Sequence, residues 1–237
     1  VIQERTLSMA MKSSMWMVDP RPNLTSIVDT VENAFDLSEA SNTPVIMQLR
    51  VRACHVQGRF VARDNVAPKI NTRDRLANPA AFNYGRLAHP PVTFVQEKLK
   101  IDERLPAARR FIRDRKLNEF FDGDIERLGI VLPGGLYNTL VRRLAQLGLA
   151  DDFGNSRIPL MVLNVVHPLV PEEIGGFCAG KDAILVLEEG NPEYLEQQIA
   201  LMLRKTDIQT RLHGKDVMPM AGEYTASVMH EGLMGFL

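Results

Sequence analysis

Short apolar segments alternate with amphipathic segments through the second half of the chain, and this alternation constrains the fold more than any other feature. The apolar segments, which we expect to form strands, are Leu128–Leu132, Leu160–Leu163, Ala183–Leu187 and the shorter Ile208–Arg211. The segments expected to be helical are 94–121, 136–147, a short one from Pro171, 191–205 and 223–236. Strands that are apolar throughout and alternate with helices are typical of a parallel sheet covered on both faces. The sequence therefore predicts an α/β fold.

Residues 1–55 have the pattern of one further helix–strand unit. Asn23 is suited to be a helix N-cap, and apolar residues recur after it at helical spacing, at Leu24, Ile27, Val28, Val31, Ala34 and Phe35. The strand expected next is Val45–Val51. A stable sheet needs several strands, and this part supplies one clear strand. We therefore expect the chain to be an internal piece of a longer protein, with the other strands upstream of Val1.

Residues 56–89 lack sustained periodicity, apart from a short strand expected at Gly58–Ala62. Connectors longer than about 15 residues are uncommon inside a compact domain. We therefore expect three parts: the end of an α/β domain in 1–55, a connector in 56–89, and a complete α/β domain in 90–237.

Composition and charge argue against several classes of protein. The net charge of −1 gives no electrostatic reason to expect nucleic acid or an anionic membrane as a partner. No apolar run approaches the roughly 20 residues that span a bilayer, and no secretory signal is recognisable. The two cysteines form no CxxC motif, so we expect no zinc, iron–sulfur or other metal site in this segment. Free thiols and eleven methionines fit the cytoplasm.

Gly134 and Gly135 join an expected strand to an expected helix. Two glycines there would let the backbone approach an anion at the helix N-terminus. The surrounding sequence matches neither GxGxxG nor a P-loop, so a tight turn is the simpler interpretation.

Polar residues follow two other expected strands. Glu188 and Glu189 come after the strand that ends at Leu187, and Asn164 and His167 follow the strand that ends at Leu163. Parallel sheets place their ligands at this edge. The two carboxylates could therefore do acid–base work or bind a metal, or they could begin a polar loop and favour the next helix N-terminus.

Arg50 and Arg52 lie two residues apart in or just past the strand from Val45, and His55 follows them. Alternation places both arginines on one face. In a buried strand this is costly unless a carboxylate partner or an anionic ligand lies opposite. A salt bridge to a neighbouring domain and the binding of a carboxylate or phosphate are both open.

Runs along the whole chain carry a resemblance. They are Val1–Thr6, Ala10–Trp16, Leu37–Val45, Arg50–Val56, Gly85–Pro91, Gly134–Leu136, Leu163–Asn164, Pro168–Ile174, Phe177–Lys181, Glu188–Gly190 and Pro192–Tyr194. Together they resemble the alpha subunit of the indolepyruvate:ferredoxin oxidoreductases, within the thiamine-diphosphate-dependent 2-oxoacid:ferredoxin oxidoreductase family.

The resemblance implies the fold and the reaction. It implies that residues 1–55 close a thiamine pyrimidine-binding domain and that 90–237 form a domain like the C-terminal domain of transketolase. The reaction would be oxidative decarboxylation of an aryl 2-oxoacid with thiamine diphosphate, Mg, coenzyme A and an iron–sulfur cluster, alongside a partner subunit and ferredoxin. The Glu that activates thiamine would lie upstream of Val1, and the GDG motif for the metal downstream of Leu237. No complete active site is then expected here.

The resemblance makes Arg5, Arg52 and His55 the best substrate-side candidates, because they flank the last unit of the thiamine domain. Two other interpretations remain. The chain could be a non-catalytic α/β module for binding or subunit assembly, or a nucleotide-binding protein that uses the Gly134-Gly135 turn.

Overall fold

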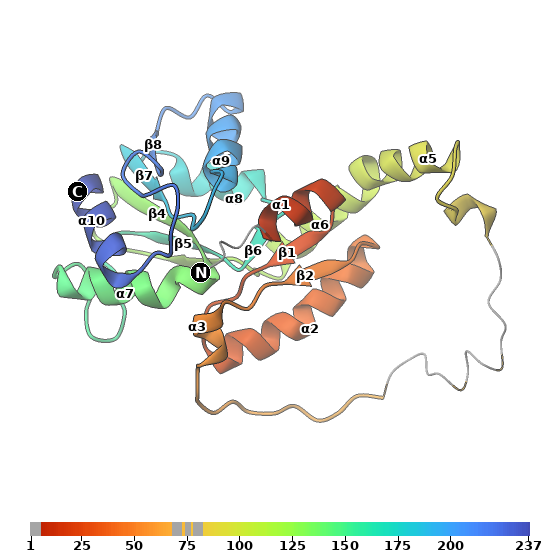
Figure 1. Cartoon of the computed structure of the whole chain (residues 1–237), viewed down its shortest axis with the longest axis horizontal. Coiled ribbons are helices and arrows are strands. Elements are labelled where there is room, and N and C mark those ends of the chain that lie inside the picture. Colours follow the sequence, from red (N-terminus) through yellow and green to blue (C-terminus); the bar gives the residue numbers. More distant parts are fainter. Residues whose placement is uncertain (1–5, 68–72, 74–76, 78–82) are drawn as a thin grey trace.

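The computed structural model describes residues 6–67, 73, 77 and 83–237. It contains two β-sheets, and the chain crosses between them more than once (Figure 1). The fold class predicted from the sequence, α/β with a mainly parallel sheet, is confirmed.

The smaller sheet has the strand order β2-β1-β6, with β1 at Trp16–Val18, β2 at Val45–Met47 and β6 at Val165–His167. The first two strands are parallel, and β6 joins β1 in the antiparallel direction. The strand expected at Val45–Val51 is therefore shorter than predicted, because the chain turns into the short helix α3 (Val51–Cys54). Strand β1, whose three residues are all buried, was not predicted.

Helices cover the small sheet. They are α1 (Thr6–Ser13), α2 (Leu24–Ser41) and α6 (Leu105–Asp114), and the last two pack against each other. Asn23 caps α2 as predicted, because its side chain accepts a hydrogen bond from the main-chain N–H of Ser26. The face of α2 differs from the prediction. Leu37 is buried, whereas Val28, Val31 and Phe35 are 40%, 42% and 72% exposed.

The larger sheet has the order β3-β5-β4-β7-β8. Its strands are β3 (Glu119–Phe121), β4 (Leu128–Pro133), β5 (Leu160–Leu163), β7 (Ala183–Val186) and β8 (Arg211–His213). All neighbours are parallel except β3, which runs antiparallel to β5. Three strands lie where the sequence predicted them. The fourth, expected at Ile208–Arg211, begins at the last residue of that range, and β3 occupies a segment that was predicted to be helical.

Side chains alternate across the larger sheet and form two apolar layers. Ile184 and Val186 of β7 point into one layer, and Leu185 points into the other. The first layer is closed by α8 (Pro171–Cys178) and α9 (Tyr194–Lys205), and the second by α7 (Tyr137–Gln146) and α10 (Ala226–Phe236). This is the two-sided cover expected of a parallel sheet.

The helical segment before β3 changes between α-helical and π-helical geometry along its length. It comprises α5 (Val92–Leu99), a π-helical turn at Lys100–Arg104 and α6. Pro106 does not break it, since the wider π turn directly precedes the proline. The helix ends at Asp114, seven residues before the predicted end at Phe121.

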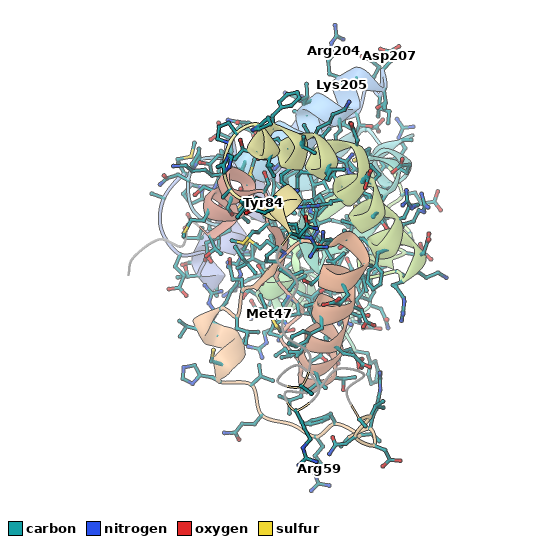
Figure 2. All side chains as sticks on the ribbon, turned by 90° about the vertical axis from the view of Figure 1, so that its right-hand side faces the viewer. Met47, Arg59, Tyr84, Arg204, Lys205 and Asp207 are labelled. Atoms are coloured by element: carbon teal, nitrogen blue, oxygen red, sulfur yellow. The ribbon has the colours of Figure 1, made fainter. Side chains whose placement is uncertain are left out.

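The chain after α3 is exposed at residues 57–67, and Figure 2 shows Arg59 far from the body of the molecule. Residues 58–62 form no strand, contrary to the prediction. At the opposite end of the molecule, the exposed Arg204 and Lys205 lie in the last turn of α9, where cations favour the helix dipole. No described helix is long and apolar enough to cross a membrane.

The expected three-part division remains a prediction. Elements assigned to the first and third parts nevertheless pack against each other. Strand β6 and helix α6 both come from the part assigned to 90–237, yet β6 pairs with β1 and α6 packs on α2. The two sheets are therefore connected through shared structure as well as through the chain.

Candidate functional site

The site lies at the carboxyl ends of β4, the central strand of the larger sheet, and of its neighbour β7. From β4 the chain passes through α7 to β5 on one side, whereas β7 lies on the other side. The strand order thus reverses between β4 and β7. Such a switch point leaves a crevice outside the strand ends, where open α/β sheets bind ligands.

The Gly134-Gly135 turn lies in this crevice. The space beside the two glycines is occupied by other parts of the chain. A Cβ atom on Gly134 would lie 2.3 Å from the main-chain oxygen of Asp19. A Cβ atom on Gly135 would lie 2.4 Å from Cδ of Arg50 and 2.5 Å from Oδ1 of Asp19. The main-chain N–H of Gly135 donates a hydrogen bond to the Asp19 carboxylate. An internal carboxylate therefore takes the place that a phosphate would need, and the turn serves close packing.

Arg50 binds carboxylates on both sides. Its Nε and Nη2 atoms lie 3.0 and 2.9 Å from Oδ2 of Asp19, and Nη1 lies 2.5 Å from Oε2 of Glu189. Burial raises the pKa of the Asp19 carboxyl, and Arg50 offsets only part of that effect. Since Asp19 follows β1 and Glu189 follows β7, this ion-pair network joins the two sheets.

Arg52 extends the network towards the surface. Its Nη2 atom lies 3.2 Å from Oε1 of Glu189 and 2.5 Å from Oε1 of Glu223, and Nη1 lies 3.1 Å from the hydroxyl of Thr139. Of the two interpretations of the arginine pair, the salt bridge to a neighbouring part is confirmed. Both guanidinium groups are thus paired with carboxylates of the chain, and the side chain of Arg52 remains 36% exposed.

Glu188 has a different role from its neighbour Glu189. Its Oε2 atom accepts a hydrogen bond of 2.7 Å from the main-chain N–H of Leu195, at the start of α9. The residue is 7% exposed, and burial raises its pKa to about 7. The side chain therefore caps a helix, as one of the two interpretations predicted, and its protonation state changes near neutral pH.

Lys215 fixes the loop around Glu188. Its ammonium group donates to the main-chain oxygens of Glu188 and Gly190 and, at 2.7 Å, to the hydroxyl of Tyr224. Burial lowers the pKa of Lys215. The main-chain N–H of Tyr224 in turn donates to Glu189, at 2.6 Å. These contacts hold the segment before α10 over the strand ends.

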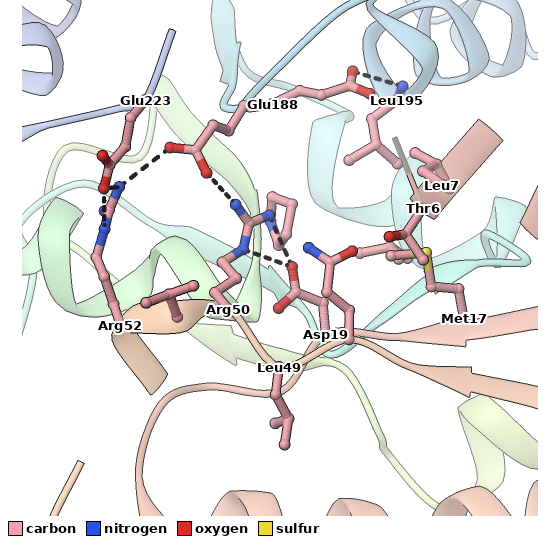
Figure 3. A pocket seen from close by; sticks show the side chains of 15 residues that line it. Thr6, Leu7, Met17, Asp19, Leu49, Arg50, Arg52, Glu188, Leu195 and Glu223 are labelled. Carbon is pink, nitrogen blue, oxygen red and sulfur yellow. Dashed lines mark hydrogen bonds and ion pairs between the residues drawn. The ribbon is translucent and has the colours of Figure 1, made fainter. Parts of the chain in front are cut away.

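A cavity of about 340 Å³ opens beside the network (Figure 3). Its apolar wall includes Leu7, Met17, Val166 and Leu195. Figure 3 shows the Glu188 side chain extending to Leu195, on the side of Leu7 and Met17. Arg50 and Asp19 lie in the middle of the view, and Arg52 and Glu223 lie on the far side of them.

The side-chain amide of Asn164 makes its hydrogen bonds to the chain itself. Its Oδ1 accepts from the main-chain N–H of Arg21 at 3.0 Å, and its Nδ2 donates to Leu117 O and to Glu119, both at 2.9 Å. These contacts fix the loop after β1. His167, in β6, is half-buried beside Trp16, and burial lowers its pKa to about 4.

Of the remaining candidates, His55 does not join the site. His55 is exposed and follows the last residue of α3. Arg5 lies outside the described residues. The described part of the chain holds no group of three or more His, Cys, Asp or Glu side chains that could bind a metal ion.

Sequence reasoning missed three residues of the network: Asp19, Lys215 and Glu223. Asp19 is 2% exposed at the end of β1. The signal available in the sequence was an acidic residue directly after three apolar residues. Lys215 lies in a segment without periodicity, and Glu223 is the first residue of a segment that was predicted to be helical. Neither position indicated a role, so only their contacts identify them.

The chain resembles known enzyme subunits along most of its length. The indolepyruvate oxidoreductase subunit IorA of Methanothermobacter marburgensis is 24% identical over 216 residues, which cover 90% of this chain and 33% of that protein. The subunit of the same name from Thermococcus kodakarensis is 25% identical over 86% of this chain and 30% of that protein. The resemblance recognised in the sequence is thereby confirmed. The chain spans about a third of the length of these relatives, and no family model matches it.

Two solved structures are also similar. The 2-oxoglutarate:ferredoxin oxidoreductase from Magnetococcus marinus matches with a TM-score of 0.40 and 15% identity, over 63% of this chain and 24% of that one. A split-gene transketolase, described as an inactive beta4 tetramer, matches with a TM-score of 0.46 and 14% identity, over 93% of this chain and 56% of that one.

Proposed function

We propose that this chain is a central part of a thiamine-diphosphate-dependent 2-oxoacid oxidoreductase of the indolepyruvate type. The similarity to indolepyruvate oxidoreductase subunits over 90% of the chain carries the proposal. In the proposed protein, residues 1–55 form the end of a thiamine pyrimidine-binding domain. Residues 56–89 connect it to residues 90–237, which form a domain like the C-terminal domain of transketolase.

The proposed reaction is the oxidative decarboxylation of an aryl 2-oxoacid in the cytoplasm. Coenzyme A receives the acyl group, and ferredoxin receives the electrons through an iron–sulfur cluster. Thiamine diphosphate, when bound, supplies the electron sink. A partner subunit completes the assembly, as the naming of the relatives as subunits suggests.

The described residues do not fit these cofactors. The Gly134-Gly135 turn is occupied by Asp19, which leaves no room there for a diphosphate. Cys54 is exposed and Cys178 is buried, and neither belongs to a described cluster of metal ligands. We therefore assign the thiamine diphosphate, Mg and iron–sulfur sites to other parts of the enzyme, and no step of the reaction to a residue described here.

The contribution proposed for this chain is positional. Arg50 and Arg52 hold the loops after β1, β2 and β7 together through Asp19, Glu189 and Glu223. This network supports a joint that sets the relative orientation of two α/β units. A positional role is also what the second candidate, a non-catalytic module for binding or subunit assembly, would require. The same network is the observation that supports this second candidate.

Ligand titration of the purified oxidoreductase that carries this chain tests the proposal. We expect saturable binding of thiamine diphosphate in the presence of Mg²⁺ and no tight binding of adenine nucleotides. Tight nucleotide binding without thiamine diphosphate binding would overturn both the enzyme and the assembly interpretations, in favour of a nucleotide-binding protein.

A further inference from the structure

The edge strand β3 of the larger sheet is left partly uncovered on the face that α8 and α9 close. Phe120 of β3 pairs with Met161 of β5, and directly paired residues lie on the same face of a sheet. Met161 is buried, whereas Phe120 remains 48% exposed. A groove with a volume of about 840 Å³ is lined here by β3, the loop that follows it and α8. The exposed ring of Phe120 is thus part of the wall of an open groove.

The groove lies at the other end of the sheet from the ion-pair network around Arg50. Three of its lining residues, Arg127, Pro159 and Lys181, precede β4, β5 and β7. They therefore mark the amino ends of these strands, whereas the network lies at the carboxyl ends. A ligand in the groove would be separate from the site described above.

Two aromatic rings line the groove. The ring centroids of Phe120 and Phe177 lie 6.2 Å apart. The Nζ atom of Lys181 lies 5.2 Å from the centroid of the Phe177 ring, so this ring already binds a cation through its face. No cation of the described residues lies over the ring of Phe120. That ring can therefore accept a cation from outside the chain.

Carboxylates are in excess along the groove. They come from the loop after β3 and from the first turn of α8, and are Asp122, Glu126, Glu172 and Glu173. None of the four forms a salt bridge with a described residue. The two basic residues of the lining are already engaged. Arg127 pairs with Asp182, and Lys181 donates to the main-chain oxygen of Glu126.

Glu173 shows the effect of this charge on the groove itself. Burial raises the pKa of its carboxyl, and the neighbouring charge of Glu172 raises it further, although a hydrogen bond from Asn118 acts in the opposite direction. A cation bound in the groove would offset the repulsion between the two acids.

The charge and extent of the groove restrict what can occupy it. Nucleic acid and anionic lipid carry the same sign of charge as the carboxylates and are disfavoured. A second copy of this chain, packed symmetrically, would bring the same four acids together, which like-charge repulsion opposes. Because the carboxylates come from two separate segments, a chain with several cationic side chains fits the groove better than one small amine.

We propose that the groove between β3 and α8 is a docking site for a basic segment of another polypeptide, in which one arginine stacks on Phe120 while other cations pair with the carboxylates. Arginine suits the site better than lysine, because its planar guanidinium both stacks on aromatic rings and binds carboxylates through two hydrogen bonds. This inference goes beyond the proposed function, because it concerns a partner surface and does not depend on turnover.

Calorimetric titration of the purified protein that carries this chain tests the docking site. The probes are a tri-arginine peptide, acetylated and amidated at its ends, and spermidine, which carries the same charge without guanidinium groups. At low ionic strength the peptide should bind saturably and about tenfold more tightly than spermidine, and added salt should weaken its binding. No saturable binding of the peptide, or equal affinity for spermidine, would overturn the proposal.

Substitutions at exposed positions of the groove locate the binding. Phe120→Ala should weaken peptide binding about threefold through the lost ring, and the double variant Glu126→Gln/Glu172→Gln should weaken it about tenfold. The control is Glu231→Gln, which removes one exposed carboxylate from α10 on the opposite face of the sheet and should leave binding unchanged.

Two results with these variants would contradict the docking site. One is an affinity for the peptide that both groove variants retain or that the control loses equally. The other is self-association of the unsubstituted protein that Phe120→Ala abolishes, since the occupant would then be a second copy of the chain. Because no 2-oxoacid or thiamine diphosphate is involved, these outcomes are independent of the oxidoreductase reaction.

Discussion

Arg50 joins the two sides of the ion-pair network, and its two carboxylate partners explain why a buried charge is tolerated there. Asp19 on one side is 2% exposed, and Glu189 lies on the other. Removing one partner of a buried pair leaves the other charge without compensation, which costs more than the pair contributes.

Replacing Arg50 should therefore destabilise the fold strongly. We expect Arg50→Ala to lower the free energy of unfolding by about 3 kcal/mol or more, measured by denaturant unfolding. Arg127→Ala is the matched control, because Arg127 pairs with Asp182 at the exposed surface. It should cost at most about 1 kcal/mol. Equal effects of the two variants would contradict a buried role for Arg50.

Glu188 should make stability depend on pH. Its pKa is about 7 in the folded state and near 4.5 without burial, so between these values the folded state binds more protons than the unfolded state. The free energy of unfolding should then fall as pH rises through this window, by about 3 kcal/mol at most, at 1.4 kcal/mol per pKa unit.

Glu188→Gln isolates this contribution, because it removes the titration and keeps an acceptor for the α9 N-terminus. Relative to the wild type, the variant should gain stability between pH 5 and pH 8, as measured by denaturant unfolding at both values. A stability difference that stays constant across that range would show that Glu188 does not titrate near neutrality.

At the scale of elements, apolar runs were sufficient to predict three strands of the larger sheet, β4, β5 and β7. β4, β5 and β7 are buried on both faces, so their composition alone marks them. β1 and β3 were missed because each has three residues, too few to show a period. Helix α2 was placed correctly, but Val28, Val31 and Phe35 on its apolar face are exposed, since periodicity identifies an apolar face and not what covers it.

The candidate site was less predictable than the fold. Glu188, Glu189, Arg50 and Arg52 were all singled out from their positions near strand ends. Their partners could not be predicted, because Asp19, Lys215 and Glu223 reach the site through tertiary contacts between segments far apart in the sequence.

The Gly134-Gly135 turn is the element on which the close approach of the two sheets depends. We expect Gly134→Ala to destabilise the chain by about 2 kcal/mol or more, because the added Cβ atom would meet main-chain atoms of the loop after β1 at 2.3 and 2.6 Å. Gly176→Ala, in helix α8, has nothing within 4 Å of the added atom. It should be neutral or stabilising by up to about 1 kcal/mol. Thermal unfolding of both variants measures the contrast, and equal midpoints would refute the packing role.

The whole molecule should unfold as one unit, since β6 and the Arg50 network tie the small sheet to the large one. Trp16 is the single tryptophan and lies in the small sheet, so its fluorescence reports that sheet, while far-UV circular dichroism reports both. We expect coincident unfolding curves for the wild type and separated curves for Arg50→Ala. A fluorescence transition that precedes the loss of helix signal in the wild type would indicate two independent units.

The most direct test of the central claim is turnover by the complete protein that contains this chain, assembled with the partner subunit that we propose for it. With indolepyruvate, coenzyme A and a low-potential electron acceptor, we expect acceptor reduction that is lost when thiamine diphosphate is removed and restored when it is added back. An absence of turnover on any 2-oxoacid, with the cofactor present and the assembly intact, would contradict the assignment.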